Sequence, residues 1–189
     1  MKVIQLFKND SLLIKRAATG NRQAQRKIYE KHSGKMLSVC RQYVKDMHHA
    51  EEVMLNGFFK VFTHLKYFRE EGSFEGWMRK IMVRESISFL RTDKQSMFAE
   101  DEVPENVNIS YSFIEDLNVA HIQELIDSLP EGYKMVFLMY AVEGYKHHEI
   151  AKMLNITEGT SKSQLFKARK MLQEKLEREN KTEYGTGKI

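Results

Sequence analysis

The residues of this chain that are best suited to chemistry are the basic and polar side chains in the second half of residues 146–172. Apolar residues recur at helical spacing in both halves of this segment, which predicts two short amphipathic helices joined by a turn. These apolar residues are Ile150, Ala151, Leu154, Leu165, Ala168 and Leu172. The pattern is that of a helix-turn-helix, whose second helix enters the major groove of DNA with its N-terminus first. The chemistry that it predicts is therefore recognition of bases and phosphates by side chains.

The second of these two helices carries the groups that would contact DNA. Gly159 permits a tight bend before it, and we expect Thr160 or Ser161 to cap its first turn. The side chains expected to face outward are Ser161, Lys162, Gln164, Lys167 and Lys170, with Arg169 near the rim. The alternative for this segment is a helical hairpin at the surface with a solvated basic face.

A second candidate for nucleic-acid binding spans residues 67–91, where aromatic and basic residues alternate. The rings are Tyr67, Phe68, Phe74 and Trp77, and the cations are Arg69, Arg79, Lys80, Arg84 and Arg91. Single-stranded nucleic acid binds to such mixtures because cations neutralise its backbone while rings stack on its bases, at about 1–3 kcal/mol per base. Phe74 and Trp77 also suit a core, since aromatic residues at helical spacing are often buried.

These candidates must be positioned mainly by helices. The chain has 189 residues, of which 42% are apolar and 30% charged, with 10 Gly and 2 Pro, and this composition suits one large or two small helical domains. No apolar run reaches the length of a membrane span, and residues 1–13 lack the apolar core of a signal peptide. We therefore expect a cytoplasmic protein.

Little in the sequence favours an enzyme or a metalloprotein. Cys40 is the single cysteine, and we expect it to be a small buried residue. His48 and His49 are adjacent, but adjacent residues on a helix point about 100° apart, and no third ligand follows at metal-binding spacing. No glycine loop for phosphates and no nucleophile–base set is present. We predict no catalytic residues, no metal, no other cofactor and no small-molecule substrate.

Charge divides the chain into three parts. Residues 1–92 carry a net charge of +9 (18 basic and 9 acidic), residues 93–118 carry −6 (1 and 7), and residues 119–189 carry +1 (11 and 10). The acidic stretch contains Pro104 and shows little helical periodicity, so it predicts a flexible linker between two small all-α domains. It is expected either to lie in a basic groove, to repel nucleic acid or to act as a solvated spacer.

This division predicts the domain boundaries. We expect a helical bundle at residues 8–92, the linker at 93–118, a helix-turn-helix domain at 119–178 and a disordered tail at 179–189. The bundle is expected to hold three or four helices, the first of them capped near Asp10.

The two halves together resemble the extracytoplasmic-function (ECF) sigma factors, group IV of the sigma-70 family, which are promoter-specificity subunits of bacterial RNA polymerase. In the first half the resemblance rests on residues 43–46 (YVKD), 50–53 (AEEV), 58–62 (FFKVF), 74–81 (FEGWMRKI) and 90–91 (LR). In the second it rests on residues 129–134 (LPEGYK), 143–144 (EG), 149–151 (EIA), 159–163 (GTSKS) and 168–169 (AR). It runs over nearly the whole chain, from about residue 10 to residue 176.

The resemblance implies three sets of functional residues. Core RNA polymerase would be bound by Asp46, Glu51, Glu52, Leu55, Phe58, Phe59 and Phe62. The −10 element would be melted and read by Arg69, Phe74, Trp77, Arg79, Lys80, Arg84 and Arg91. The −35 duplex would be bound by Thr160, Ser161, Lys162, Ser163, Gln164, Lys167, Arg169 and Lys170. The implied partners are core RNA polymerase, promoter DNA (duplex at −35, single strand at −10) and an anti-sigma factor. The implied mechanism is binding and strand separation without covalent chemistry.

Some residues depart from the family pattern. Leu55 stands where Gln is usual, Phe62 where Trp is common, Arg84 where Asn is frequent and Ser161 where Val is frequent. Two other functions remain open at this point. One is a helix-turn-helix regulator that works without polymerase, which leaves the N-terminal patterns without a purpose. The other is a sigma-like decoy that binds an anti-sigma protein and never DNA, which Leu55 alone favours.

Overall fold

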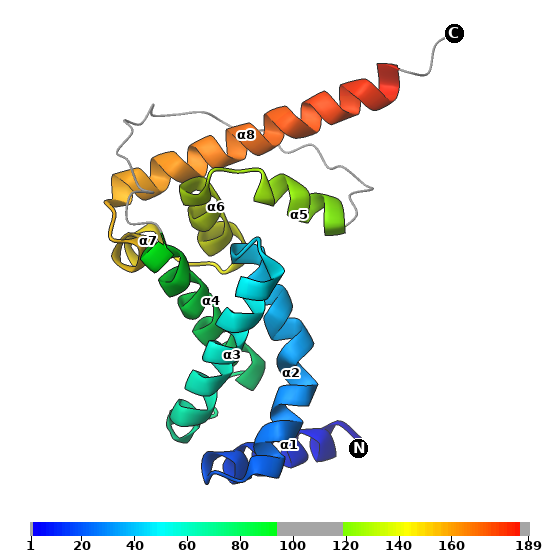
Figure 1. The fold of residues 1–189 in the computed structure, drawn as a ribbon, viewed down its shortest axis with the longest axis vertical. Helices are drawn as coiled ribbons and strands as arrows, with labels where there is room; N and C mark the ends of the chain where they lie inside the picture. The colour runs from blue at the N-terminus through cyan, green and yellow to red at the C-terminus, as the bar shows by residue number, and fades with distance from the viewer. Residues whose placement is uncertain (1, 94–118, 186–189) are drawn as a thin grey trace. The chain divides into compact units, whose positions relative to one another are not determined.

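The chain forms two compact helical units, one on each side of residue 93 (Figure 1). The computed structural model describes the backbone of residues 2–93 and 119–185, and the side chains of residues 10–92 and 120–179. Every element in these parts is helical, so the predicted all-α class with two small helical domains is confirmed. Residues 94–118, which hold nearly all of the predicted linker, lie outside the described residues. Within the described parts, no helix is long and apolar enough to cross a membrane.

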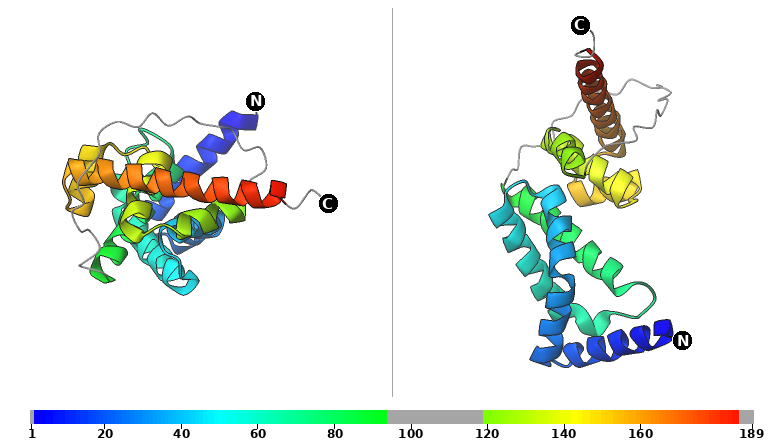
Figure 2. Two further views of the ribbon diagram at one scale, coloured as in Figure 1. Left: turned by 90° about the horizontal axis from the view of Figure 1, so that it is seen from above. Right: turned by 90° about the vertical axis from the view of Figure 1, so that its right-hand side faces the viewer.

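The N-terminal unit is a bundle of three long helices with a fourth across one end. Its elements are α1 (Lys2–Ala18), α2 (Arg22–Tyr43), α3 (Met47–His64), the 3₁₀ turn η1 (Leu65–Tyr67) and α4 (Phe74–Asp93). Helices α2, α3 and α4 lie side by side, and α1 crosses the end of the bundle beside η1 (Figure 1; Figure 2, right). The first helix therefore begins well before the predicted cap at Asp10.

Local sequence determines where these helices begin and end. Gly20 adopts a φ of 85°, which L side chains rarely take, and so reverses the chain after α1. The Asn21 side chain accepts a hydrogen bond from the Ala24 N–H at 2.9 Å and caps α2. Asp46 caps α3 in the same way, by accepting from the His49 N–H at 2.9 Å.

The core of this unit lies between α2, α3 and α4. Cys40 is fully buried there, as predicted, and burial raises the pKa of its thiol to about 11. Helix α4 packs against α3 at Gly57, where an added Cβ would overlap the end of the Met82 side chain. A larger residue at position 57 therefore requires Met82 to shift.

The C-terminal unit is arranged around one long helix. Its elements are α5 (Val119–Asp127), α6 (Glu131–Phe137), the short π-helical segment η2 (Leu138–Val142), α7 (His147–Leu154) and α8 (Glu158–Gly185). Helices α5, α6 and α7 pack against α8, and the last turns of α8 extend beyond α6 and α7 (Figure 1).

The C-terminal end of α8 differs from the sequence prediction. The backbone of residues 179–185 is helical, not an irregular tail, while residues 186–189 lie outside the described part. Residues with good helix propensity, such as Lys181 and Glu183, continue α8 as far as Gly185 without a proline.

The core of the C-terminal unit contains the predicted apolar residues and one buried ion pair. Ile150, Leu154, Leu165 and Ala168 are buried as expected. Lys134 of α6 is only 1% exposed, and its Nζ donates a hydrogen bond to the Asp127 carboxylate at the end of α5. This pair connects α5 and α6 across the Leu129–Pro130 turn.

Candidate nucleic-acid and protein interfaces

The helix-turn-helix is present, but its turn is built differently from the prediction. Asn155, not Gly159, adopts the left-handed conformation, with φ 56°, and ends α7. Thr157 rather than Thr160 or Ser161 caps α8, because its Oγ1 accepts a hydrogen bond from the Thr160 N–H at 3.0 Å. Helix α8 thus begins at Glu158, earlier than the sequence analysis assumed.

The start of α8 separates the predicted DNA contacts into two groups. Lys162 and Lys170 are exposed, and Lys167 and Arg169 are half-buried. The buried residues are Thr160, Ser161, Ser163 and Gln164, which are 8%, 0%, 1% and 5% exposed. The prediction that Ser161 and Gln164 face outward is therefore wrong.

Helical spacing explains the direction of Ser161. It lies four residues before Leu165 and so continues the apolar stripe of α8 toward the N-terminus. Its Oγ lies 2.9 Å from Nδ1 of His147, the first residue of α7. The Oε1 atom of Gln164 is buried and has no hydrogen-bond partner among the described residues.

In the N-terminal unit, three aromatic rings gather where the chain enters α4. Phe68 lies 5.2 Å from Phe74 and 5.4 Å from Trp77, measured between ring centroids, and Phe74 stacks on Trp77 at 5.9 Å. Phe74 and Trp77 are half-buried, so each ring combines packing with partial access to solvent. Beside the cluster is a cleft of about 400 Å³, lined by Tyr67, Phe68, Arg69, Glu71, Gly72, Ser73, Gly76, Trp77 and Lys80.

Most of the predicted cations of α4 share one face of the helix. Lys80, Arg84 and Arg91 follow Trp77 at intervals that keep them on one side of the helix, and all three are exposed. Arg69, in the loop before α4, is also exposed. Arg79 points to another side of α4, where it lines a cleft toward α2 and is half-buried. The structure thus brings Arg69 and Lys80 to the cleft beside the rings, while Arg84 and Arg91 continue along the same face of α4 away from it.

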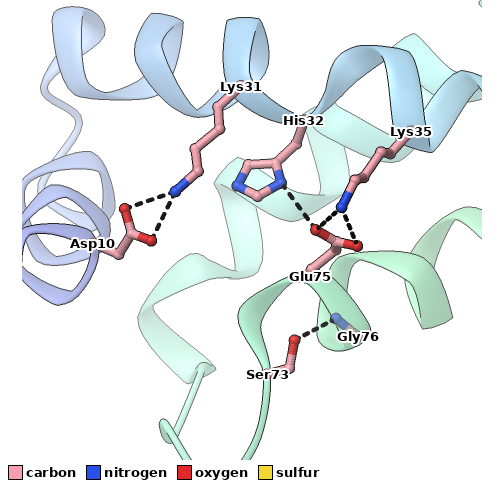
Figure 3. A network of polar contacts seen from close by, with 7 residues as sticks. All are labelled: Asp10, Lys31, His32, Lys35, Ser73, Glu75 and Gly76. Carbon is pink, nitrogen blue, oxygen red and sulfur yellow. Dashed lines mark hydrogen bonds and ion pairs between the residues drawn. The ribbon is translucent and has the colours of Figure 1, made fainter. Parts of the chain in front are cut away.

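Polar contacts from α2 hold the first turn of α4 in place (Figure 3). Glu75 accepts hydrogen bonds from Lys35 Nζ at 3.0 and 3.1 Å, and Nδ1 of the buried His32 lies 3.9 Å from the same carboxylate. The Ser73 hydroxyl accepts from the Gly76 N–H at 3.2 Å. Burial and, next, Lys31 lower the pKa of His32 and so favour the neutral form of the ring.

A third region, on α3, has the character of a protein-binding surface. Met47, Glu51, Leu55 and Phe59 recur every four residues and are exposed, with Phe59 70% and Leu55 53% exposed. Exposed large apolar side chains on one helical stripe are unusual for a surface that only meets water. Glu52 is exposed beside them, and Asp46 and Glu51 add negative charge to the same helix.

Two residues predicted for this surface belong partly or wholly to the core. Phe58 is 2% exposed and its ring lies 4.9 Å from that of Tyr29, so its predicted contact with polymerase is contradicted by its burial. Phe62 is half-buried, with its ring 5.9 Å from Phe58. On a helix, Phe58 and Phe59 point about 100° apart, and only Phe59 lies on the exposed stripe.

Several residues near these surfaces were missed by the sequence analysis. Met47 was missed on α3, although its four-residue spacing from Glu51 was visible. His147 and Tyr140, which contact the start of α8 or each other, gave no signal, because their contact depends on how α6, η2 and α7 fold together.

Comparison with known proteins assigns both units. The family model described as "Sigma-70 region 2" matches residues 28–96, and the model described as "Sigma-70, region 4" matches residues 120–172. The chain is 25% identical to the ECF RNA polymerase sigma-E factor of Haemophilus influenzae, with 89% of this chain and 95% of that protein covered. It is 25% identical to the ECF RNA polymerase sigma factor SigW of Bacillus subtilis, with 86% and 94% covered.

The chain belongs to the ECF sigma factors.

A solved structure shows the same fold for this sigma factor. The sigma factor RpoE of Bartonella quintana, crystallised with the anti-sigma factor NepR, aligns with a TM-score of 0.50 at 18% identity, over 80% of this chain and 96% of that one. The matched regions place the aromatic cluster and α3 in sigma region 2, and the helix-turn-helix in region 4. Sigma factors are initiation factors and not enzymes in themselves. Among the described residues, no group of three or more His, Cys, Asp or Glu is placed to hold a metal ion.

Proposed function

We propose that this sigma factor binds core RNA polymerase and directs it to promoters, and that each of the three surfaces described above carries one part of that task. Residues 8–92 are proposed to bind polymerase and to melt the −10 element, and residues 119–178 are proposed to recognise the −35 element. The observation that carries the proposal is the pair of exposed apolar side chains on α3, Leu55 and Phe59, on a helical bundle that already has its own core.

The α3 stripe is the proposed docking surface for core polymerase. Phe59 is the proposed anchor, because a largely exposed aromatic ring gains most when a partner buries it, and aromatic anchors dominate many interfaces. Leu55 extends the apolar area, and Glu51 and Glu52 supply charges at its edge. Leu55 replaces the Gln usual in the family, so this contact is more apolar here than the family pattern implies.

The aromatic cluster and the cationic face of α4 form the proposed −10 site. Unstacking or extruding a base costs a few kcal/mol. Stacking on a ring such as Phe68 or Trp77 returns about 1–3 kcal/mol per base, and the neighbouring cleft has room for an extruded base. Lys80, Arg84 and Arg91 are proposed to follow the phosphates of the separated strand.

The exposed and half-buried cations of α8 form the proposed −35 site. Lys162, near the N-terminus of the helix, and Lys167 are proposed to approach base edges in the major groove. Arg169 and Lys170 are proposed to contact phosphates, which position the helix without reading sequence. The buried residues Ser161 and Gln164 no longer belong to the proposed set of base contacts.

The proposed role also implies a place of action and a second partner. The protein acts in the cytoplasm, where polymerase is, and performs no covalent chemistry of its own. An anti-sigma protein is a proposed second partner, since the exposed Leu55 and Phe59 need cover when polymerase is absent.

The test is reconstitution with core polymerase. The full chain should form a stoichiometric complex with purified bacterial core enzyme and support transcription from a subset of a promoter library. Phe59→Ala should weaken the complex by about tenfold or more, as loss of an interface anchor does, while leaving the thermal stability unchanged. Lys27→Ala, an exposed change on α2, is the matched control and should leave the complex intact.

The possible results separate the functions that the sequence left open. A folded chain that binds promoter-like DNA but not core polymerase would contradict the proposal and favour a polymerase-independent regulator. A chain that binds neither would favour the decoy. The exposed ring of Phe59 favours a polymerase-binding sigma factor over a regulator that works on DNA alone, because such a regulator does not need an apolar protein-binding surface.

A further inference from the structure

One imidazole connects three elements at the base of the recognition helix. His147, the first residue of α7, lies with Nδ1 2.9 Å from the Ser161 hydroxyl of α8. Its ring stacks on Tyr140 of η2, with centroids 4.6 Å apart and planes at 23°. The chain of contacts Tyr140–His147–Ser161 thus runs from η2 through α7 into α8.

Helix α8 meets this chain of contacts at a second point. The guanidinium of Arg169 lies over the Tyr140 ring, 5.6 Å from its centroid, in cation–π geometry. Ser161 and Arg169 are separated by roughly 12 Å along the helix axis. Two contacts this far apart constrain both the position of α8 and its rotation about its own axis.

The chemistry of the contact explains why a hydroxyl stands at position 161. Ser161 is 0% exposed, so a purely apolar side chain there would pack but would leave His147 Nδ1 without its partner. A serine hydroxyl can either donate or accept, and it therefore suits either tautomer of a neutral imidazole. Burial and, next, Lys162 lower the pKa of His147, which favours the neutral form of the ring.

We propose that His147 and Ser161 are positioning residues that set the rotation of α8 and thereby determine which base pairs Lys162 and Lys167 reach. Neither residue touches DNA in this proposal. Because the end of a lysine side chain lies far outside the helix backbone, a small rotation of α8 about its axis moves that end from one base pair toward the next. The inference rests on the proposed −35 function and specifies what controls its sequence preference.

The experiment measures sequence preference rather than affinity alone. Holoenzyme assembled from core polymerase and the full chain selects from promoters whose −35 segment is randomised and whose −10 segment is fixed. Ser161→Ala removes the hydroxyl, and His147→Phe keeps the ring on Tyr140 but removes Nδ1. Each variant should change the base preference at one or more positions by roughly fivefold or more, the scale of one good base contact. The double variant should show the same change as either single one, and Ser161→Thr should retain the wild-type preference.

Other outcomes separate this inference from the function on which it rests. A wild-type holoenzyme without any −35 preference would overturn the proposed function and the inference together. A wild-type preference that Ser161→Ala and His147→Phe both retain, even with lower affinity for every sequence, would overturn the inference alone. If either variant fails to fold, Tyr140→Leu gives the same test, because Tyr140 is 37% exposed and its loss removes the surface under both His147 and Arg169. An unchanged preference in that variant would also overturn the inference.

Discussion

On α4, the cations Lys80, Arg84 and Arg91 lie on an exposed face, while the core residues of the bundle lie on the other side of the helix. On α8, the exposed Lys162 is flanked by Ser161 and Ser163, which are buried. Buried residues stand beside the exposed cations on both helices, but on α4 they are the apolar Val83 and Leu90, whereas on α8 they are the polar Ser161 and Ser163. A substitution on the face of α4 can therefore change binding alone, whereas polar substitutions early in α8 also change how the helix is held.

The two units also differ in how exposed their ion pairs are to water. The Lys31–Asp10 pair, between α2 and α1, has side chains that are 50% and 49% exposed (Figure 3). The Lys134–Asp127 pair of the C-terminal unit has side chains that are 2% and 16% exposed. Water can replace either partner of the first pair but not of the second.

The largest expected effect concerns these ion pairs. Lys134→Ala leaves Asp127 without its main cation in a nearly dry site, so the free energy of unfolding of the C-terminal unit should fall by about 3–5 kcal/mol. The matched change Lys31→Ala should cost the N-terminal unit about 0–1 kcal/mol. Hydrogen exchange of the full chain in increasing urea, read by mass spectrometry, reports each unit separately. Equal losses of unfolding free energy from the two changes would contradict this difference between a buried and an exposed ion pair.

A second prediction distinguishes outward from inward positions on α8. Lys162→Ala should remove about 1–3 kcal/mol of discrimination at one −35 base pair, because an exposed lysine near the N-terminus can reach a base edge. Gln164→Ala should leave the base preference unchanged, since its side chain is buried. Both are measured by selection from a −35 library with the holoenzyme. A base preference that depends on Gln164 and not on Lys162 would reverse the assignment.

A third prediction concerns the face of α4. Lys80→Ala and Arg84→Ala should each lower the slope of log K against log salt by about 0.7 for a promoter with a pre-opened −10 strand. The melting temperature of the protein should not change, because both side chains are exposed. Holoenzyme binding over a series of KCl concentrations gives the slope, with Lys27→Ala on α2 as the control. A lower melting temperature with an unchanged slope would assign these residues to packing instead.

The smallest expected effect is a dependence of stability on pH that both units share. The pKa of His32 and the pKa of His147 are both lowered from 6.5, in each case chiefly by burial. The unfolded chain then takes up protons at higher pH than the folded chain, so stability is complete above about pH 6.5 and falls as the solution becomes more acidic. Urea unfolding at several pH values should show this loss, and His32→Phe and His147→Phe should each reduce it. A rise in stability on acidification would contradict both shifts.

The sequence predicted well those features that depend on local periodicity. The all-α class, the helix-turn-helix and its apolar stripe follow from 3.6-residue spacing, and Cys40 is buried as its surroundings indicated. The residues of α3 that the resemblance assigns to polymerase binding differ in exposure, since Leu55 and Phe59 are exposed, Phe58 is buried and Phe62 is half-buried. The resemblance alone does not separate them, whereas the structure does, because neighbouring positions on a helix point in different directions.

The errors on α8 have a common cause. The sequence analysis placed the helix start at Thr160 or Ser161, whereas Thr157 caps it. The earlier start of α8 does not change the spacing of Leu165 and Ala168. Extending their apolar stripe by one turn toward the N-terminus of the helix would have included Ser161. A polar residue in an apolar stripe was interpreted as a surface residue, because its buried partner, His147, belongs to another element. Contacts between separate elements are the part that single-sequence reasoning lacks.

The packing of Met82 of α4 over Gly57 of α3 has a consequence for mutation. A larger residue at position 57 requires Met82, which is fully buried, to move within the core. A change at this point of α3 is therefore also a change in the packing of α4, the helix that carries Trp77 and the exposed cations.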